Sequence, residues 1–360
     1  MLIHRLWLTD FRNYRAVDLR FGPGVTAVLG SNGQGKTNLL EGIAYLATLS
    51  SFRAAPTEAM VRAGATRAVI RGEGDREGRT LLLEAELVTN GRNRAQVNRQ
   101  PLRRTSALLG ALRVTVFSPD DLALVKGSPG QRRQYLDDGL VALHPRHQDT
   151  RSEVERVLRQ RNALLKQAGG RLTRDVKSTL DVWDTKLAAS GEALASAREE
   201  LVDRLGPMLG VAYDQLASTQ AHALLRYRPS WGAGGLGTAL AAGRGDDLRR
   251  GITLVGPHRD DLEVTIGELP ARTHASQGEQ RSLALALRLS LHRLVTESTQ
   301  STPVLLLDDV FSELDQERGH ALIAHLPVGQ TVITAAHGLP EMARPDGVID
   351  VADGHARART

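Results

Sequence analysis

The chain has 360 residues, of which 41% are apolar, so it can bury a sizeable core and form two or three structural units. It contains no cysteine, which excludes disulfides and thiolate metal sites, and no run approaches the roughly 20 apolar residues that a membrane span needs. We therefore expect a cytoplasmic protein. The net charge of +5 is compatible with polyanion binding, but arginine enrichment can equally reflect a genome rich in G and C.

The first third of the chain is predicted to be rich in β-structure. Short alternating or apolar segments predict strands at Leu2–Leu8, Val25–Leu29, Ala68–Arg71, Leu81–Val88, Arg94–Val97 and Val114–Phe117. Asn90-Gly91 stands between two of these strands. It predicts a hairpin, because both residue types tolerate the positive φ that a type I′ turn requires.

The middle of the chain, from about Gln131, has the periodicity of helices. One apolar face marks a first helix that ends at Gly169-Gly170, and leucines recur every seven residues in a second helix. The two faces consist of Val154, Val157, Leu158, Leu164 and Leu165, and of Leu180, Leu187, Leu194 and Leu201 with Trp183 and Ala197 between them. The leucine face of the second helix suits packing on the first helix, and it is too short for a long coiled coil.

Glycine-rich segments at Gly232–Gly237 and Gly243–Gly245 predict a mobile connection after the helices. Strand character then returns at Ile252–Val255 and Val304–Leu307. We therefore predict a discontinuous head domain, residues 1–128 and 248–360, with an inserted helical domain at residues 129–247.

A phosphate-loop pattern, G-x-x-x-x-G-K-[ST], lies between a predicted strand and an apolar helix. Its residues are Gly30, Ser31, Asn32, Gly33, Gln34, Gly35, Lys36 and Thr37. The glycines let backbone amides curl round phosphates, and the helix N-terminus adds a positive dipole. We expect Lys36 to reach the β- and γ-phosphates and the Thr37 hydroxyl to ligate magnesium. The alternative is a glycine-rich turn that caps an ordinary helix.

The apolar run Val304–Leu307 ends in Asp308 and Asp309, as expected of a central strand that delivers carboxylates to the carboxyl edge of a sheet. We expect Asp308 to hold magnesium through its water shell and Asp309 to polarise an attacking water. Asp309 is one methylene shorter than the Glu common at this position in related ATPases, which predicts slow hydrolysis. Alone, such a run is equally typical of a strand followed by a turn.

A short segment, Ser276, Gln277, Gly278, Glu279 and Gln280, precedes a leucine-, alanine- and arginine-rich stretch that favours a helix packed on two sides. Ser276 with Glu279 is a capping box, and a cap alone is the alternative. The segment resembles the signature of the ATP-binding-cassette superfamily, and Ser312-Glu313-Leu314-Asp315, which follows the acid pair, resembles the D-loop of that superfamily. The resemblance implies that Ser276 and its helix N-terminus contact the γ-phosphate held by the opposite subunit, with Ser312 and Asp315 in the D-loop.

Further segments match one family in order: Phe11–Tyr14, Gly30–Glu41, Ser51–Arg53, Phe117–Leu122, Gln131–Arg133, Gly256–Leu262, Ser276–Ser282 and Leu306–Asp315. They resemble the RecF family of recombination mediators, which is related to the heads of SMC and Rad50 proteins. The resemblance implies an α/β fold, a P-loop ABC-type ATPase head of mixed sheet with an antiparallel β lobe, plus the inserted helical domain. No glutamine stands clearly at a Q-loop position, and Asp120 and His337 stay unassigned.

The same resemblance implies a function. It predicts an ATP-dependent homodimer that uses ATP and Mg²⁺, clamps DNA at single-strand gaps and junctions, and works with RecO and RecR to load RecA in replication and the SOS response. A weak, DNA-stimulated ATPase activity resets it. The implied catalytic residues are Asp309, Lys36 and Ser276; Arg12 and Asn13 join the phosphate loop in binding ATP, and Thr37 and Asp308 hold the metal.

Two basic clusters are candidates for DNA contact. The hairpin cluster comprises Arg92, Arg94, Arg99, Arg103 and Arg104, and the helix cluster comprises Arg151, Arg156, Arg159, Arg161, Lys166, Arg171 and Arg174. Neither contains an aromatic residue, which favours contact with the duplex backbone and little sequence specificity over base stacking. The alternative for both is a solvated charged face.

Three other functions are compatible with the phosphate loop. A metabolite kinase leaves the segment 276–280 unexplained, and a transporter ATPase gives no reason for the inserted helices and basic clusters. A Rad50-like nuclease partner is disfavoured because the insertion is too short for a long coiled-coil arm.

Overall fold

The computed structural model describes residues 2–76, 78–217, 222–336 and 338–359. Its contacts divide the chain into two units. The first comprises Met1–Leu122, Val211–Gln220 and Ser276–Thr360, and the second comprises Ala123–Gly210 and Ala221–Ala275. Within the described ranges, no helix is long and apolar enough to cross a membrane.

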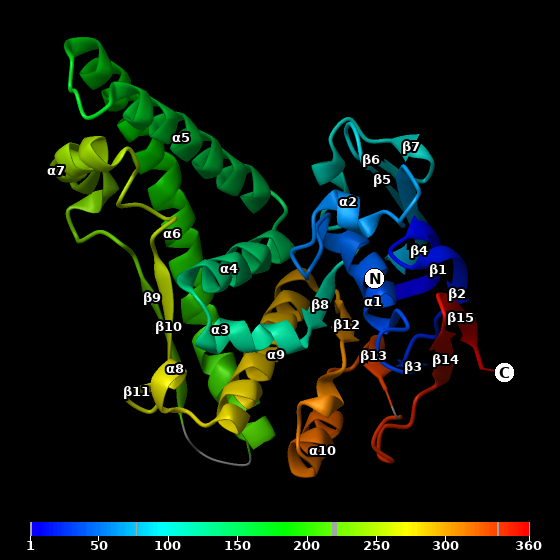
Figure 1. The fold of residues 1–360 in the computed structure, drawn as a ribbon. Helices are drawn as coiled ribbons and strands as arrows, with labels where there is room; N and C mark the ends of the chain where they lie inside the picture. Colours follow the sequence, from blue (N-terminus) through cyan, green and yellow to red (C-terminus); the bar gives the residue numbers. More distant parts are fainter. Residues whose placement is uncertain (1, 77, 218–221, 337, 360) are drawn as a thin grey trace. The chain divides into compact units, whose positions relative to one another are not determined.

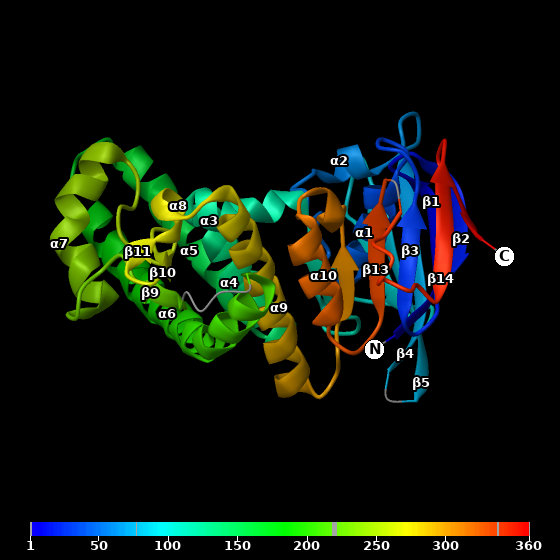
Figure 2. The ribbon, with the colours of Figure 1, turned by 90° about the horizontal axis from the view of Figure 1, so that it is seen from below.

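The first unit contains two sheets built from the N- and C-terminal thirds of the chain (Figure 1). The antiparallel sheet has the order β2 (Tyr14–Arg20), β1 (Leu2–Phe11), β4 (Arg67–Arg76), β5 (Arg79–Val88), β6 (Arg94–Val97) and β7 (Gln100–Pro101). The mixed sheet has the order β15 (His355–Ala358), β14 (Gly347–Ala352), β3 (Val25–Leu29), β13 (Thr331–Ala335), β12 (Val304–Leu307) and β8 (Val114–Phe117). Only the β14–β15 pair of the mixed sheet is antiparallel among the described strands, and Figure 2 shows β13, β3 and β14 side by side.

The core of the first unit surrounds its first helix. Leu39, Leu40, Ile43 and Leu46 of α1 are fully buried in one cluster with residues of both sheets. Every residue of β12 and β13 is buried, as their apolar sequences predict for central parallel strands. The helices here are α1 (Lys36–Thr48), α2 (Thr57–Met60), α9 (Gln277–Thr299) and α10 (Gln316–Ala324), with 3₁₀ turns η1 (Thr105–Leu108), η2 (Pro119–Leu122) and η3 (Val310–Ser312).

The second unit is mainly helical. Its helices are α3 (Ala123–Lys126), α4 (Pro129–Leu143), α5 (His147–Ala168), α6 (Arg174–Ala217), α7 (Gly235–Arg250) and α8 (Ala271–His274). Helix α6 belongs to this unit as far as Gly210. The small sheet has the order β11 (Leu269–Pro270), β10 (Asp261–Ile266), β9 (Ala223–Arg228). The predicted leucine seam of α6 is confirmed, since all four leucines are at most 3% exposed. Each such burial contributes roughly 1.5–3 kcal/mol.

The unit boundaries differ from those predicted. Residues 248–275, assigned from sequence to the head, group with the helical unit because β10 pairs with β9. Residues 123–128 also fall in the helical unit, and residues 211–220 fall in the first unit.

Two local predictions are wrong. The glycine-rich stretch predicted to be mobile contains α7, whose Leu236, Leu240 and Leu248 are buried. The predicted strand Ile252–Val255 does not form, because side chains of other segments bind its backbone.

The predicted hairpin after β5 is confirmed, since β5 and β6 pair antiparallel. Its turn is not type I′: Gly91 has φ 118°, whereas Asn90 lacks the positive φ that this turn requires. The connection spans residues 89–93, longer than a two-residue turn.

Candidate functional site

The phosphate loop, residues 30–37, joins the end of β3 to the start of α1, as predicted. Lys36 Nζ donates to the carbonyl oxygens of Gly30 at 2.6 Å and Ser31 at 3.1 Å, and to Asn32 Oδ1 at 3.3 Å. The loop therefore curls round an ammonium group at the helix N-terminus, where both the cation and the helix dipole favour a bound anion.

Two acidic residues follow β12 at the carboxyl edge of the parallel strands. Asp308 is buried, and its Oδ1 accepts hydrogen bonds from Thr37 Oγ1 and Thr334 Oγ1, each at 2.9 Å. Burial raises the pKa of Asp308, and these two bonds oppose the rise. Burial lowers the pKa of Lys36, and the negative charges of Asp309 and Asp308 oppose this decrease. The fold thus brings the loop threonine and lysine to the acid pair, as the sequence predicted.

Thr334 was not identified from the sequence as part of this site. Its hydroxyl donates to Asp308 and accepts from the Asp309 amide at 2.8 Å, so it holds both acidic residues. Its position follows from the strand register, which only the structure gives: Leu307 pairs with Ile333 in the parallel ladder, so the next residue of β13 lies beside Asp308.

The phosphate loop is braced from outside by two turns. Asn13 Nδ2 donates to Gln34 O at 2.9 Å, and Asn13 Oδ1 accepts from Asn38 Nδ2 at 2.9 Å. The Asp353 amide donates to Gln34 Oε1, and a Cβ at Gly354 would lie 2.8 Å from Asn13 O. Asn13 therefore lies against the loop, and its predicted contact with ATP stays a prediction.

Arg12 lies in the same turn, but its side chain is directed elsewhere. Its guanidinium makes two 2.6 Å hydrogen bonds to the fully buried Glu41 carboxylate and one of 2.8 Å to Ala59 O. Ser51 Oγ donates to the same carboxylate. These bonds connect β1, α1 and α2, and the role of Arg12 in binding ATP stays a prediction.

The signature segment, residues 276–280, begins α9 as the predicted capping box. Ser276 N donates to Glu279 Oε2 at 2.7 Å, and Glu279 N donates to Ser276 Oγ at 3.3 Å. The D-loop segment, residues 312–315, leads into α10, whose N-cap is Asp315, and Ser312 Oγ donates to Asp309 O at 2.8 Å. The signature segment lies against Arg318 of α10, whereas the phosphate loop contacts Asp308, the end of β13 and the turns that brace it.

The hairpin cluster is accessible. Its five arginines are all exposed, and four of them line a groove of about 810 Å³ with Asn93, Gln96 and Leu102. Arg94 has one distant carboxylate partner, Glu86 at 3.9 Å. The cluster is therefore free to meet phosphates.

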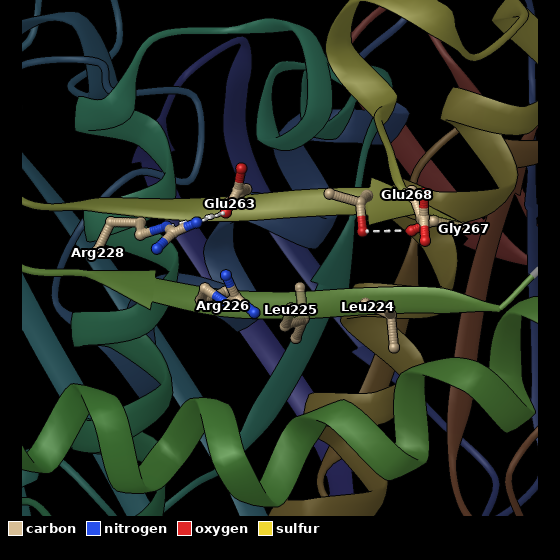
Figure 3. A pocket seen from close by; sticks show the side chains of 8 residues that line it. Leu224, Leu225, Arg226, Arg228, Glu263, Gly267 and Glu268 are labelled. Atoms are coloured by element: carbon tan, nitrogen blue, oxygen red, sulfur yellow. Dashed lines mark hydrogen bonds and ion pairs between the residues drawn. The ribbon is translucent and has the colours of Figure 1, made fainter.

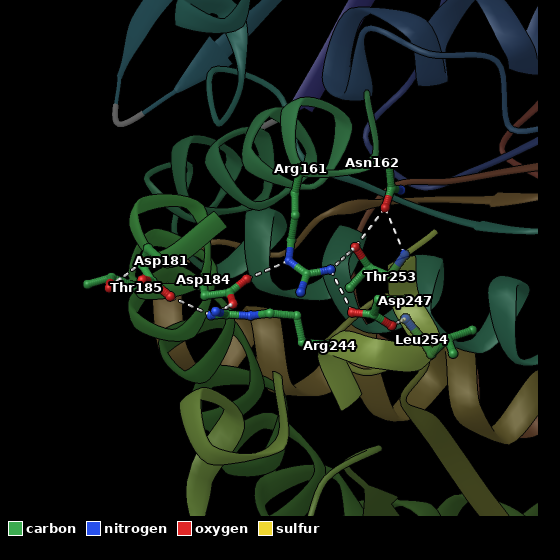
Figure 4. Close-up of polar contacts among 9 residues, drawn as sticks. All are labelled: Arg161, Asn162, Asp181, Asp184, Thr185, Arg244, Asp247, Thr253 and Leu254. Atoms are coloured by element: carbon green, nitrogen blue, oxygen red, sulfur yellow. Dashed lines mark hydrogen bonds and ion pairs between the residues drawn. The ribbon is translucent and has the colours of Figure 1, made fainter. Parts of the chain in front are cut away.

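Three of the seven residues in the helix cluster have acidic partners, and the prediction is wrong for Arg161. Arg161 is fully buried and binds Asp184 at 2.6 Å, Asp247 at 2.7 Å and Thr253 at 2.8 Å (Figure 4), so it cannot reach DNA. Arg151 pairs with Asp138 and Glu155, and Arg156 pairs with Glu153. The remaining members are exposed: Arg159, Lys166, Arg171 and Arg174.

One groove was not foreseen. It lies along β9 and β10, has about 540 Å³, and is lined by Leu224, Leu225, Arg226, Arg228, Glu263, Thr265, Gly267 and Glu268 (Figure 3). Of its two arginines and two glutamates, Arg228 and Glu263 pair with each other at 2.7 Å. Of the two unassigned residues, Asp120 is exposed in η2, and His337 lies outside the described residues.

Known proteins resemble the whole chain. The model of the RecF/RecN/SMC N-terminal domain family matches residues 2–352. The "DNA replication and repair protein RecF" of Streptomyces avermitilis is 45% identical and that of an Arthrobacter species 42% identical, each alignment covering 93% of this chain and 93% of the relative.

Solved structures agree with this relationship. The structure of "the recombination mediator protein RecF-ATP in RecFOR pathway" has a TM-score of 0.92 at 28% identity and covers 99% of this chain and 97% of that one. An Smc head domain from Pyrococcus furiosus, with a TM-score of 0.58 at 17% identity, covers 99% of this chain and 95% of that one and shares the fold. The predicted α/β class with a P-loop ABC-type ATPase head is thus confirmed. On sequence and fold together, the chain belongs to the RecF family.

Proposed function

We propose that the chain is an ATP-dependent DNA-binding protein of recombinational repair. ATP-driven dimerisation of the head would clamp DNA at single-strand gaps and junctions, and with RecO and RecR the protein would promote RecA loading. The observation that carries this proposal is the buried Asp308, which binds Thr37 of the phosphate loop. The relatives' names, and the solved RecF-ATP structure, support the pathway and the nucleotide.

Magnesium fits the oxygen atoms present at the acid pair. Thr37 Oγ1 and Asp308 Oδ1 are 2.9 Å apart, and hydroxyl and carboxylate oxygens, directly or through water, are what this ion prefers. When bound, the ion neutralises phosphate charge and polarises the bond to be broken. Lys36 would exchange its loop carbonyl partners for the β- and γ-phosphates, and Thr334 would keep Asp308 turned towards Thr37.

Asp309 is proposed as the residue that polarises the attacking water. Its amide is held by Thr334, and its backbone has the left-handed φ of 47°. An aspartate carboxylate extends less far than a glutamate carboxylate, so water would be positioned less well and hydrolysis would be slow. Slow hydrolysis, stimulated by DNA, suits a clamp that stays closed while its partners act.

The site is proposed to be completed by a second copy of the chain. The capping box occupies the amides of Ser276 and Glu279, and the Gln280 amide donates to Ser276 O. Among the described contacts, the amides of Gln277 and Gly278 are left for an anion at the N-terminus of α9. Two identical heads would then share two ATP molecules, each held by one phosphate loop and the other copy's signature segment.

The test compares the mass in solution of the wild type and Ser276→Arg with ATP and magnesium, with ADP, and without nucleotide, followed by DNA binding of the same samples. We expect ATP alone to give a wild-type dimer that binds DNA. Ser276→Arg should bind ATP but stay monomeric, because a bulky cation replaces the small hydroxyl at the helix N-terminus. Ser178→Arg, at an exposed serine of α6, is the matched control and should dimerise.

A wild type that hydrolyses ATP as a monomer would show that the shared site is wrong. ADP production that depends on an added small acceptor would instead support a kinase.

A further inference from the structure

Arg318 lies against the signature segment of its own chain. A Cβ at Gly278 would stand 2.6 Å from Arg318 Nη1, 3.0 Å from Cζ and 3.1 Å from Nη2. Real side chains essentially never come so close, so Gly278 leaves the space that the guanidinium occupies. The charge of Arg318 also helps to lower the pKa of Glu279, after the hydrogen bonds from Ser276.

The same guanidinium binds the D-loop segment. Arg318 Nη1 pairs with the Asp315 carboxylate, whose Oδ1 also accepts the Arg318 amide at 2.9 Å. A second arginine makes the reverse connection, because Arg281, in the first turns of α9, donates to Glu313 O at 3.1 Å and pairs with its carboxylate. Two arginines, one from each helix, thus join the signature segment to the D-loop segment.

We propose that Arg318 is a positioning residue that holds the signature segment in a set position against the D-loop segment. The two segments would then meet a partner subunit's nucleotide as one body. A guanidinium suits this place, because Nη1 pairs with Asp315 while Nη1, Cζ and Nη2 together fill the space beside Gly278. The inference rests on the proposed shared nucleotide site and adds how each copy prepares its half.

The test is Arg318→Gln, which removes the charge and the reach of the side chain. We expect ATP affinity of the monomer to stay within about twofold, because the phosphate loop keeps its own contacts. The dissociation constant of the ATP-dependent dimer should rise at least about tenfold. The kcat of ATP hydrolysis should fall while KM for ATP stays unchanged. Arg293→Gln is the control, since Arg293 is an exposed arginine of α9 that pairs only with Glu297 among the described ion pairs. It should behave as the wild type.

A double-mutant cycle separates positioning from a general structural role. In Gly278→Ala the added Cβ should displace Arg318 without changing any charge, and should weaken the dimer as Arg318→Gln does. The two substitutions together should be no worse than either alone, because both disturb the same contact. Additive effects would contradict the proposal.

Other outcomes also decide. If Arg318→Gln dimerises like Arg293→Gln, the positioning role is wrong while the shared site stands. If it loses monomer ATP binding together with dimerisation, Arg318 serves general stability and the proposal is overturned. A wild type that never dimerises with ATP overturns the shared site, and the positioning role falls with it.

Discussion

His292 is a buried residue whose ionisation opposes folding. It belongs to α9, is 1% exposed and faces β8, where its Nδ1 lies 3.0 Å from Thr115 Oγ1; its Nε2 has no partner among the described residues. Burial lowers the pKa of His292 to about 4. The folded chain therefore keeps this imidazole neutral at pH values where an unfolded chain takes up a proton, near pH 6.5.

This difference predicts a loss of stability in acid. The contribution of a neutral His292 is complete above about pH 6.5 and decreases as the pH falls towards about 4, because only the unfolded state binds the proton in that range. Between pH 6.5 and 5, the wild type should lose about 2 kcal/mol more than His292→Gln, which cannot titrate. Urea unfolding at both pH values measures this, and equal losses in the two proteins would show that His292 does not contribute.

At the scale of elements, Arg161 shows how a charged side chain can organise helices. It lies on α5 and binds Asp184 of α6 and Asp247 of α7, and Arg244 of α7 returns to Asp184 at 2.7 Å (Figure 4). Asp247 is also fully buried. Removing one partner of such a pair leaves an uncompensated charge in an apolar interior, which is more damaging than the pair is stabilising.

Arg161→Met should therefore destabilise the helical unit by roughly 3–5 kcal/mol. Urea unfolding followed by circular dichroism measures the loss, and hydrogen exchange should show it in α5 and α7. Arg156→Met, at an exposed arginine of the same helix that pairs with Glu153, should change stability by less than about 1 kcal/mol. Similar stability of the two variants would mean that the buried network contributes little.

Some of these features are predictable from sequence and others are not. The phosphate loop, the acid pair and the capping box are predictable because each follows from local spacing. Arg161 was grouped with DNA-binding arginines because spacing does not reveal which charges are buried by distant carboxylates. The strand predicted at Ile252–Val255 failed for a related reason: Asn162 and Asp247 bind the amides of Thr253 and Leu254 and replace a strand partner.

At the scale of the whole molecule, the hairpin cluster is the basic surface to test first for DNA. Four of its arginines line one groove, whereas in the helix cluster Arg151 and Arg156 have acidic partners beside the exposed Arg159, Lys166, Arg171 and Arg174. In an ATP-dependent dimer each copy would present one such hairpin, so two basic surfaces would act on one duplex. Binding through phosphates is independent of base sequence and releases counterions, which makes it sensitive to salt.

Replacing Arg94, Arg103 and Arg104 with glutamine should weaken duplex binding equally for two unrelated sequences of the same length. If each arginine contacts one phosphate, the slope of log affinity against log salt concentration should become shallower by about 2.7 for each hairpin on the duplex, since each contact contributes about 0.9. Replacing Arg226, Arg249 and Arg250, which are exposed on the helical unit, removes the same charge and should leave the slope nearly unchanged. If both triple variants lose affinity alike, net charge rather than the hairpin governs binding; if affinity depends strongly on sequence, base contacts that the hairpin cannot supply must be present.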